Sequence, residues 1–384
     1  MLTLGDLPRR QQDVNDLIMS VGGYWTLSAA AVRLLEEIGE FSEIYPPTQG
    51  IYSKIEMEGE LADLYIITTC IANQHLIALP EPAAEVSSNL SPAELLRDLI
   101  IRAGRIARIV NYYDGPKRPR TMDGWESLET AITAFHRSLG RVALDIGIRL
   151  EDAVANKLVV ARGKDRGRFA ASFDPVTSEI IAEFSMLTSS RLCPYAKNAR
   201  VWGARKCRHG EHIGEYVRET SPDFMRFLKC ALVERLDGFI FGFEHSATPN
   251  LADLSVLLRD FLLTVSGYDS PSNNCFQGEV RVRGWQFSIA GIRLFVSVFS
   301  NVYDQTHPRY SQDSTFIFLQ PEESFSWHSI GSQYAGSESR HRKVRERFLD
   351  AGYWYPSELI DRRIEADLYI LPPGPEFSPV IWWS

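Results

Sequence analysis

LLEEIGEFSEIY at residues 34–45 and GELADLYII at residues 59–67 both place acidic residues among apolar residues that recur with helical spacing. Five of these acidic residues lie along the apolar stripes, namely Glu36, Glu37, Glu40, Glu60 and Asp63. Side chains three or four positions apart share one face of an α-helix. We therefore expect two helices that each carry carboxylates on one face, and these carboxylates converge if the helices are antiparallel neighbours.

Carboxylates that converge within a few ångströms repel one another, and burying them without partners is costly. A divalent cation removes both costs, and clustered carboxylate oxygens suit a hard ion such as Mg²⁺. The alternative is a solvated acidic face with ordinary charge pairs one turn apart. We favour the metal site because Leu34, Ile38 and Phe41 lie beside the glutamates, and basic residues four positions away are scarce.

The composition is that of an ordinary globular protein, with 45% hydrophobic and 23% charged residues. The length of 384 residues favours two domains, since a single hydrophobic core stops growing near ~250–300 residues. A net charge of -8 argues against a general nucleic-acid or anionic-membrane binder. No apolar run has the length of a membrane span, and the amino terminus lacks the form of a signal peptide. The five cysteines are too few, and odd in number, for a disulfide framework, so we expect a cytoplasmic protein.

The period of the apolar residues changes near residue 165. Residues 1–168 carry apolar residues at three- to four-residue spacing, which predicts an all-α helical bundle. Residues 175–384 combine strand-like runs, such as DGFIFGFEH and EVRVRGWQFSIAG, with helical stretches. This predicts an α+β domain with a mainly antiparallel sheet. The sequence therefore predicts a multi-domain chain.

The helical half contains an internal duplication, with a degenerate second repeat at about residues 92–165. Aligning Gly39 with Gly104 keeps the apolar positions of LLEEIGEFSEI and IIRAGRIARIV in register. The carboxylates then align with basic or small residues: Glu37 and Glu40 with Arg102 and Arg105, Glu60 and Asp63 with Ala131 and Ala134. We expect the first repeat to carry the acidic site and the second to supply structure.

The spacing Glu37-x2-Glu40, followed after residues 41–59 by Glu60-x2-Asp63, resembles the signature of the MazG-like all-α nucleotide pyrophosphohydrolases. The flanking sequence is also similar, with WTLSAAAVRLLEEIGEF before the motif and GIRLEDAVANKLVVARGKDRGRF closing the second repeat. The resemblance covers about residues 15–168.

This resemblance implies Mg²⁺-dependent hydrolysis of a nucleoside triphosphate to the monophosphate and pyrophosphate. Glu37, Glu40, Glu60 and Asp63 would hold Mg²⁺, and Glu36 would be an extra ligand or the base that orients the attacking water. The candidate phosphate contacts are basic side chains: Lys54, Lys157, Arg162 and Lys164. The alternative for each of these basic residues is solvated surface charge.

Members of this family usually pair protomers into a four-helix bundle. In this chain the degenerate repeat would supply the second helical pair, which leaves one metal site where a symmetric pair would have two. A homodimer is a further expectation. The alternative function is that the helical half is a non-catalytic nucleotide-binding or dimerisation module, and that only the C-terminal domain is catalytic.

Two stretches of the second half resemble the YqcI/YcgG family. CPYAKNA, residues 193–199, is similar to that family's cysteine motif. The run from Trp285 to Phe325 is similar to its strand, loop and strand, and SRHRKVRERFLDAGYW, residues 339–354, to its arginine-rich helix. The resemblance covers about residues 180–384 and implies a domain related to haem-dependent N-hydroxylases.

By this resemblance the domain would bind haem b and oxygenate an arginine-like or amine substrate, with electrons from a separate donor. His307, in the loop after an apolar strand, is the first candidate for the axial ligand, and Cys193 is the second. Candidates to pair with propionates or a substrate carboxylate are Arg309, Arg340 and Arg342. The alternatives are structural: a small buried cysteine, a loop histidine and surface arginines.

CRHGEH, residues 207–212, admits a zinc interpretation through Cys207, His209 and His212. The spacing lacks the paired C-x2-C form of structural zinc sites, which makes this interpretation weak. The sequence has no P-loop, GxGxxG or GxSxG motif at a strand–helix turn.

Overall fold

The chain divides into two compact units in the computed structural model, one of Thr3–Val176 and one of Met1–Leu2 with Thr177–Ser384. The division lies close to residue 175, where the sequence places the start of the second domain. The structure describes residues 1–46, 53–80, 89–164, 172–189, 196–244, 248, 250–270, 273–328 and 337–384. No helix in these ranges is both long enough and apolar enough to cross a membrane.

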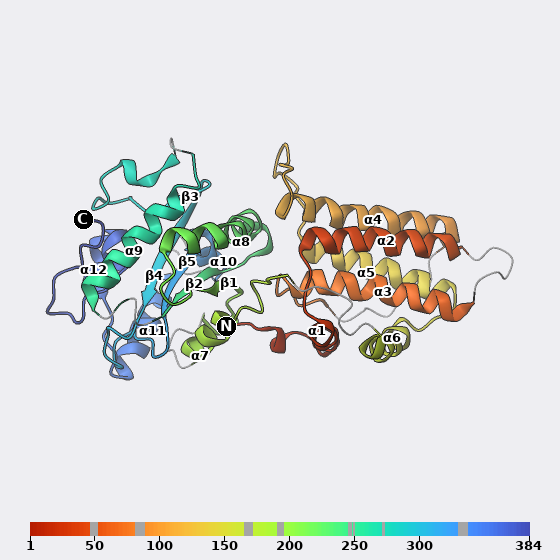
Figure 1. The fold of residues 1–384 in the computed structure, drawn as a ribbon, viewed down its shortest axis with the longest axis horizontal. Helices are drawn as coiled ribbons and strands as arrows, with labels where there is room; N and C mark the ends of the chain where they lie inside the picture. Colours follow the sequence, from red (N-terminus) through yellow and green to blue (C-terminus); the bar gives the residue numbers. More distant parts are fainter. Residues whose placement is uncertain are drawn as a thin grey trace. The chain divides into compact units, whose positions relative to one another are not determined.

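The first unit is built from helices throughout its described residues (Figure 1). They are α1 (Arg9–Val21), α2 (Leu27–Ile44), α3 (Lys54–Asn73), α4 (Pro92–Tyr113), α5 (Leu128–Asp145) and α6 (Leu150–Lys164), preceded by the short 3₁₀ helix η1 (Leu4–Asp6). Helices α2 and α3 pack together, as do α4 and α5, and the two pairs meet through α2 on α4 and α3 on α5. Helices α4 and α5 fall within residues 92–165, the range of the predicted second repeat. Helices α1 and α6 pack on α3 and on each other.

Local sequence sets where these helices begin. Thr26 caps α2 by accepting a hydrogen bond from Ala29 N, while Ser53 and Ser91 form capping boxes at the starts of α3 and α4. Helix α3 is the central helix, and its residues from Leu64 to Asn73 are all buried because α1, α2, α5 and α6 surround it. Glu60 and Asp63 come just before this buried run and are half-buried, whereas Glu56 in the first turn is exposed.

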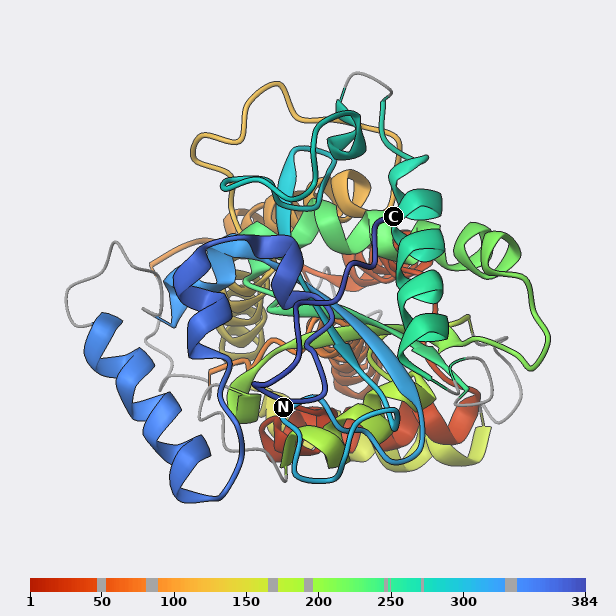
Figure 2. The ribbon, with the colours of Figure 1, turned by 90° about the vertical axis from the view of Figure 1, so that its left-hand side faces the viewer.

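The second unit contains a five-stranded sheet with the order β1-β2-β5-β4-β3. The strands are β1 (Val201–Lys206), β2 (Gly238–Phe243), β3 (Ser288–Ile289), β4 (Ile292–Phe299) and β5 (Thr315–Pro321). The helices are α7 (Glu179–Ser189), α8 (Ile213–Glu234), α9 (Leu251–Ser266), α10 (Glu322–Trp327), α11 (Ser337–Asp350) and α12 (Ser357–Arg362), with 3₁₀ turns η2 (Ala196–Asn198), η5 (Cys275–Gln277) and η6 (Glu365–Leu368). In Figure 2, α9 (teal) and α11 (blue) lie on opposite sides of the view.

The sheet is mixed, which corrects the prediction of a mainly antiparallel sheet. Strands β1 and β2 pair in parallel, whereas the pairs β2–β5, β5–β4 and β4–β3 are antiparallel. The parallel pair arises because α8 is a crossover helix that returns the chain to the end at which β1 began. A second correction concerns EVRVRGWQFSIAG, residues 279–291, in which only Ser288–Ile289 is a strand.

The two faces of strand β2 have different partners. Phe239 and Phe241 pack against Phe224 of α8, with ring centroids 5.3 Å and 5.5 Å away. On the other face a Cβ on Gly242 would lie 2.8 Å from the Ile180 side chain of α7, so glycine allows that helix to approach closely. The alternation of large and absent side chains thus places α8 and α7 on opposite faces of the sheet.

Candidate functional site

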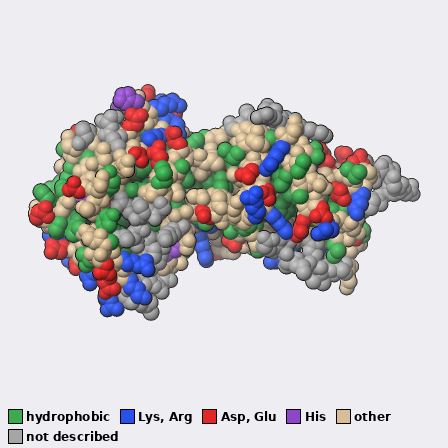
Figure 3. Space-filling model, turned by 90° about the horizontal axis from the view of Figure 1, so that it is seen from below, with side chains coloured by type: hydrophobic (Ala, Val, Ile, Leu, Met, Phe, Trp, Pro, Cys, Tyr) green, Lys and Arg blue, Asp and Glu red, His purple; other side chains and the backbone are tan. Residues whose placement is uncertain are grey.

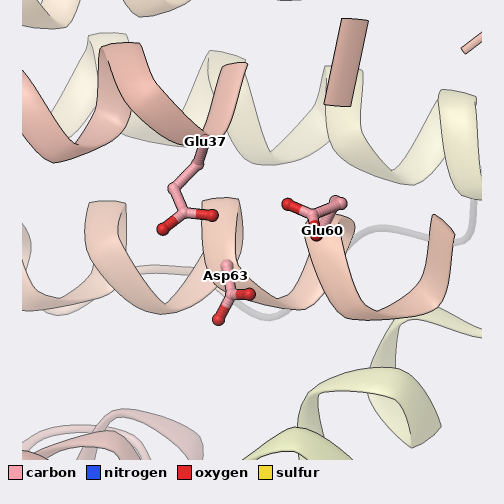
Figure 4. Close-up of side chains that lie close together, drawn as sticks. All are labelled: Glu37, Glu60 and Asp63. Carbon is pink, nitrogen blue, oxygen red and sulfur yellow. The ribbon is translucent and has the colours of Figure 1, made fainter. Parts of the chain in front are cut away.

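Three carboxylates from two helices converge in the first unit. Glu37 extends from α2 toward α3, where Glu60 and Asp63 stand one turn apart (Figure 4). One oxygen from each residue lies within 4.8 Å of the others. Among the described residues, these three form the group whose side chains could together hold a metal ion. All three are among the acidic residues for which the sequence predicts convergence.

A cavity of about 270 Å³ opens onto this cluster. Its acidic lining is Glu36, Glu37, Glu40, Glu60 and Asp63, and its apolar lining is Leu17, Ile18, Val21, Trp25, Ile66, Ile67 and Ala161. The apolar part comes largely from α1 and the segment after it, which the sequence analysis did not connect with the site. Figure 3 views the face that carries α1 and α6 and shows acidic and basic side chains side by side next to apolar ones.

The predicted metal ligands divide into two groups. Glu37 is buried and belongs to the converging set with Glu60 and Asp63, whereas Glu36 and Glu40 are exposed and line the cavity outside that set. The sequence predicts Glu40 as a metal ligand. In the structure Glu40 lines the same cavity but is not one of the three residues whose oxygens converge. Helix α2 turns one side chain of its acidic stripe fully toward α3 and leaves the others at the cavity mouth.

Two basic side chains contact the cluster. Lys157 of α6 forms an ion pair with Asp63, and Arg33 Nη2 lies 3.8 Å from Glu37 Oε1. Arg33 also lies over the Trp25 ring, with its Cζ 4.6 Å from the ring centroid. Arg33 was missed in the sequence, although a basic residue four positions before Glu37 is the signal that identifies it.

The other predicted phosphate contacts lie elsewhere. Lys54 is exposed, and its Nζ donates a hydrogen bond to the Gly147 carbonyl oxygen at 2.6 Å. Arg162 is exposed and is not part of the cavity lining. Lys164 ends α6, and its side chain lies outside the described residues. Lys157 is thus the predicted phosphate contact that the fold places at the carboxylates.

The environment of the cluster favours a bound cation. Burial raises the pKa of the Glu37 carboxyl to about 8, with further contributions from Asp63, Glu60 and Glu40 against the opposing charge of Arg33. Burial also raises the pKa of Glu60, as do Asp63 and Glu40, while Lys157 opposes them. The Oε2 atom of Glu60 is buried and has no hydrogen-bond partner among the described residues. These hard oxygen donors and their mutual repulsion fit Mg²⁺, which binds through one or two carboxylates and shares its shell with water and phosphate.

The predicted second repeat carries an ion pair whose charges are reversed relative to Arg33 and Glu37. Arg33 and Glu37 of α2 align with Asp98 and Arg102 of α4 in the register set by Gly39 and Gly104. Arg102 Nε lies 2.9 Å from Asp98 Oδ2. A basic side chain therefore occupies the position that would offer a metal ligand, so the second repeat lacks the counterpart of Glu37.

The second unit has a cavity of about 360 Å³ on the α7 face of its sheet. Aromatic rings dominate its lining, namely Phe184, Phe295, Phe299, Phe318, Phe325, Phe348 and Tyr355. Polar residues in the lining include Arg309, Asp237 and His328. Arg309 lies over the Phe299 ring, with its Cζ 5.0 Å from the centroid.

His307, the first candidate for a haem ligand, is buried in a structural setting. Its Nδ1 accepts a hydrogen bond from Arg309 N at 3.0 Å, and its Nε2 lies 3.1 Å from the Pro372 carbonyl oxygen. Its ring stacks on Tyr303 at 4.1 Å between centroids. Both ring nitrogens are engaged, and His307 is not in the cavity lining, so it would ligate iron only by giving up a hydrogen bond.

Other predicted residues of this unit are partly outside the described ranges. Cys193 lies outside them, as does the side chain of Arg340. Arg342 is exposed, with its Nε 3.7 Å from Glu346 Oε1.

The cavity instead contains His328, which is not among the residues predicted from the sequence. His328 Nε2 lies 2.6 Å from Asp237 Oδ1, and this hydrogen bond raises the pKa of His328. The other oxygen of Asp237 accepts a hydrogen bond from Arg200 N at 2.8 Å. The two residues stand far apart in the sequence without a local motif, so only the tertiary structure shows that they meet.

The zinc interpretation of CRHGEH gains no support from the geometry. His209 Nδ1 lies 2.9 Å from Glu244 Oε2, and His212 caps α8 by accepting a hydrogen bond from Gly214 N. Burial raises the pKa of the Cys207 thiol to about 12, which disfavours the thiolate that zinc requires. These three side chains do not form a metal-ligand group in the described part of the chain.

No protein-family model, no curated protein and no solved structure matches the chain.

Proposed function

We propose that the helical unit hydrolyses a nucleoside triphosphate to the monophosphate and pyrophosphate with Mg²⁺ as its cofactor. The observation that carries this proposal is the convergence of Glu37, Glu60 and Asp63 beside a cavity with an apolar wall. Such a site offers a cation position next to space for a flat apolar group, and a nucleotide requires both. The resemblance of the acidic motif to the MazG-like family supports the same reaction.

Each part of the cavity has a role in this proposal. Glu37, Glu60 and Asp63 would hold Mg²⁺, which when bound polarises phosphate oxygens and neutralises charge that develops in the displacement. Glu36 and Glu40, exposed at the cavity lining, would orient a water and accept its proton. Water oxygen bonds to the α-phosphorus, the bond from that phosphorus to the bridging oxygen breaks, and pyrophosphate leaves.

The apolar wall would hold the base of the nucleotide. Leu17, Val21 and Ala161 form a small buried cluster in which α1 meets α6, and Trp25 adds an aromatic ring to the same cavity. Burying a flat base against such side chains contributes through the apolar area removed from water. The charged and apolar walls together orient the triphosphate toward the carboxylates.

The test is pyrophosphate release from a panel of ribo- and deoxyribonucleoside triphosphates, with the monophosphate identified by chromatography. We expect release with Mg²⁺ and none with EDTA, because without the cation the negative triphosphate would meet a lining with more carboxyl groups than basic groups among its described residues. Release of inorganic phosphate instead of pyrophosphate would contradict attack at the α-phosphorus. Nucleotide binding without turnover would favour the rival interpretation of a non-catalytic binding or dimerisation module.

A second candidate function concerns the C-terminal unit, which we propose as a haem-dependent N-oxygenase of an amine or guanidino substrate. The aromatic cavity supports this candidate, since its lining suits an apolar macrocycle and Arg309 suits a propionate. The fit is incomplete because backbone groups engage both ring nitrogens of His307. The cavity's own histidine, His328, is paired with Asp237.

The haem candidate predicts a Soret band in the absorption spectrum of the purified full-length protein, either as isolated or after addition of hemin. The His307→Ala variant should keep this band, because His307 lies outside the cavity lining. A preparation that retains no haem absorbance after hemin addition and removal of the unbound hemin would rule the candidate out.

A further inference from the structure

Lys157 reaches into the carboxylate cluster from a third helix. Helix α6 packs on α3, and the Lys157 ammonium forms an ion pair with Asp63 across 94 positions of the sequence. Beside it, Gly59 has no side chain, and a Cβ there would stand 3.9 Å from Lys157 Nζ. The ammonium therefore occupies the same cavity as the three converging oxygens.

The charges around this ammonium are mostly negative. The groups that face the cavity are Glu36, Glu37, Glu40 and Arg33 from α2, Glu60 and Asp63 from α3, and Lys157 from α6. Among the described residues of the lining, five carboxyl groups thus meet two basic groups, of which Arg33 lies against Glu37 and Trp25. Lys157 is the basic group placed at the Asp63 side of the cluster.

We propose that Lys157 is an internal counter-cation of the metal-free site, that Mg²⁺ displaces it from Asp63, and that the released ammonium then contacts the nucleotide phosphates. This inference rests on the proposed function. A lysine suits the role because its ammonium is a compact charge on a flexible stem. The Lys157 side chain keeps 30% of its surface exposed, so it can leave Asp63 without unpacking α6.

The displaced ammonium stays close to the reaction. The substrate phosphates enter the shell of the bound ion, which lies at the carboxylates that Lys157 leaves. The Lys157 ammonium then contacts phosphate oxygens instead of the Asp63 carboxylate. Lys157 therefore competes with the metal before the substrate arrives and assists binding afterwards.

The two roles give effects of opposite sign when the charge is removed. In Lys157→Met, the metal no longer has to displace an ammonium, so Mg²⁺ should bind the nucleotide-free protein about 10-fold more tightly, or ~1.4 kcal/mol. The same variant should bind a non-hydrolysable α,β-methylene nucleotide about 10-fold more weakly in saturating Mg²⁺, because a charge-assisted contact to phosphate is lost. If Lys157 served only to attach α6 to α3, its replacement would not increase the affinity of the protein for Mg²⁺.

The experiment is calorimetric titration of Mg²⁺ into the full-length, nucleotide-free protein, followed by titration of the nucleotide analogue. Lys157→Arg keeps the positive charge and should stay near the wild-type metal affinity. Lys54→Met is the matched control, because Lys54 contacts the Gly147 carbonyl outside the cavity and its loss should leave both affinities unchanged. Circular dichroism melting checks the fold, and Lys157→Gln replaces the methionine variant if that variant is unstable.

The outcomes separate this inference from the proposed function. A wild-type protein that binds no Mg²⁺ would overturn the metal site and the inference together. Mg²⁺ binding by the wild type that is equal or weaker in both Lys157→Met and Lys157→Gln would overturn the role of Lys157 alone. Tighter metal binding with weaker nucleotide binding is the result that supports it.

Discussion

Replacing Glu60 by glutamine is expected to reduce pyrophosphate release by at least ~100-fold and, at the same time, to raise the melting temperature of the metal-free protein. Glutamine keeps the size of the side chain but removes the charge that would hold the cation. Without metal, the same charge is a cost, because Glu60 is close to Asp63 and Glu37 and its Oε2 is buried without a hydrogen-bond partner among the described residues. Loss of activity with gain of stability is therefore the signature of a cation site.

The measurements are steady-state pyrophosphate release in Mg²⁺ and thermal melting in EDTA. Glu58→Gln is the matched control, since Glu58 stands two residues earlier on α3 and does not line the cavity. It should change neither activity nor melting temperature appreciably. A Glu60→Gln protein that keeps its activity, or that loses stability in EDTA, would contradict the metal site.

The stability of the metal-free protein is expected to fall as the pH rises from about 5 to about 8. The Glu37 carboxyl has a pKa of about 8 in the folded protein, raised from the ordinary value of 4.5, because burial and three neighbouring carboxyl groups disfavour its charge. Between these values the folded state holds a proton that the unfolded state has released, so each increase in pH lowers the free energy of unfolding. The total change is on the order of 3–4 kcal/mol.

Saturating Mg²⁺ should remove this loss, because the ion pairs with the ionised carboxylate. The stabilisation by Mg²⁺, measured as the difference in melting temperature between Mg²⁺ and EDTA, should therefore increase from pH 6 to pH 8. Glu37→Gln should flatten the dependence in EDTA, since it removes the titrating group. A wild-type curve in EDTA that rises over this range would show that Glu37 is ionised in the folded protein without metal.

The acidic half of the candidate site was predictable because it depends on local periodicity. A helix of 3.6 residues per turn places Glu60 and Asp63 on one face wherever the helix packs, and the apolar neighbours of Glu37 indicate which face is buried. The same spacing indicated that residues 1–168 are helical, as the described residues of this unit are. It did not predict the contact of Arg33, which stands one turn before Glu37 and is a basic neighbour where such neighbours are otherwise scarce.

Other parts depend on contacts between distant segments and were missed or need correction. The apolar wall from α1 and the pair of Asp237 with His328 carry no local signal. The parallel pairing of β1 with β2 depends on the crossover through α8, which residue spacing within either strand does not record. Likewise, His307 follows an apolar strand in sequence, yet the chain near Pro372 folds over it and engages its ring.

The sequence by itself determined which residues form helices α2 and α3 and which acidic side chains share a helix face, because both follow from the spacing of neighbouring residues. Only the tertiary structure decided that Glu37, rather than Glu40, joins Glu60 and Asp63, and that Lys157 reaches Asp63 from α6. The physical reason is that the rotation and offset of one helix against another are set by the packing of their whole surfaces. The spacing of residues within one helix does not specify this rotation and offset.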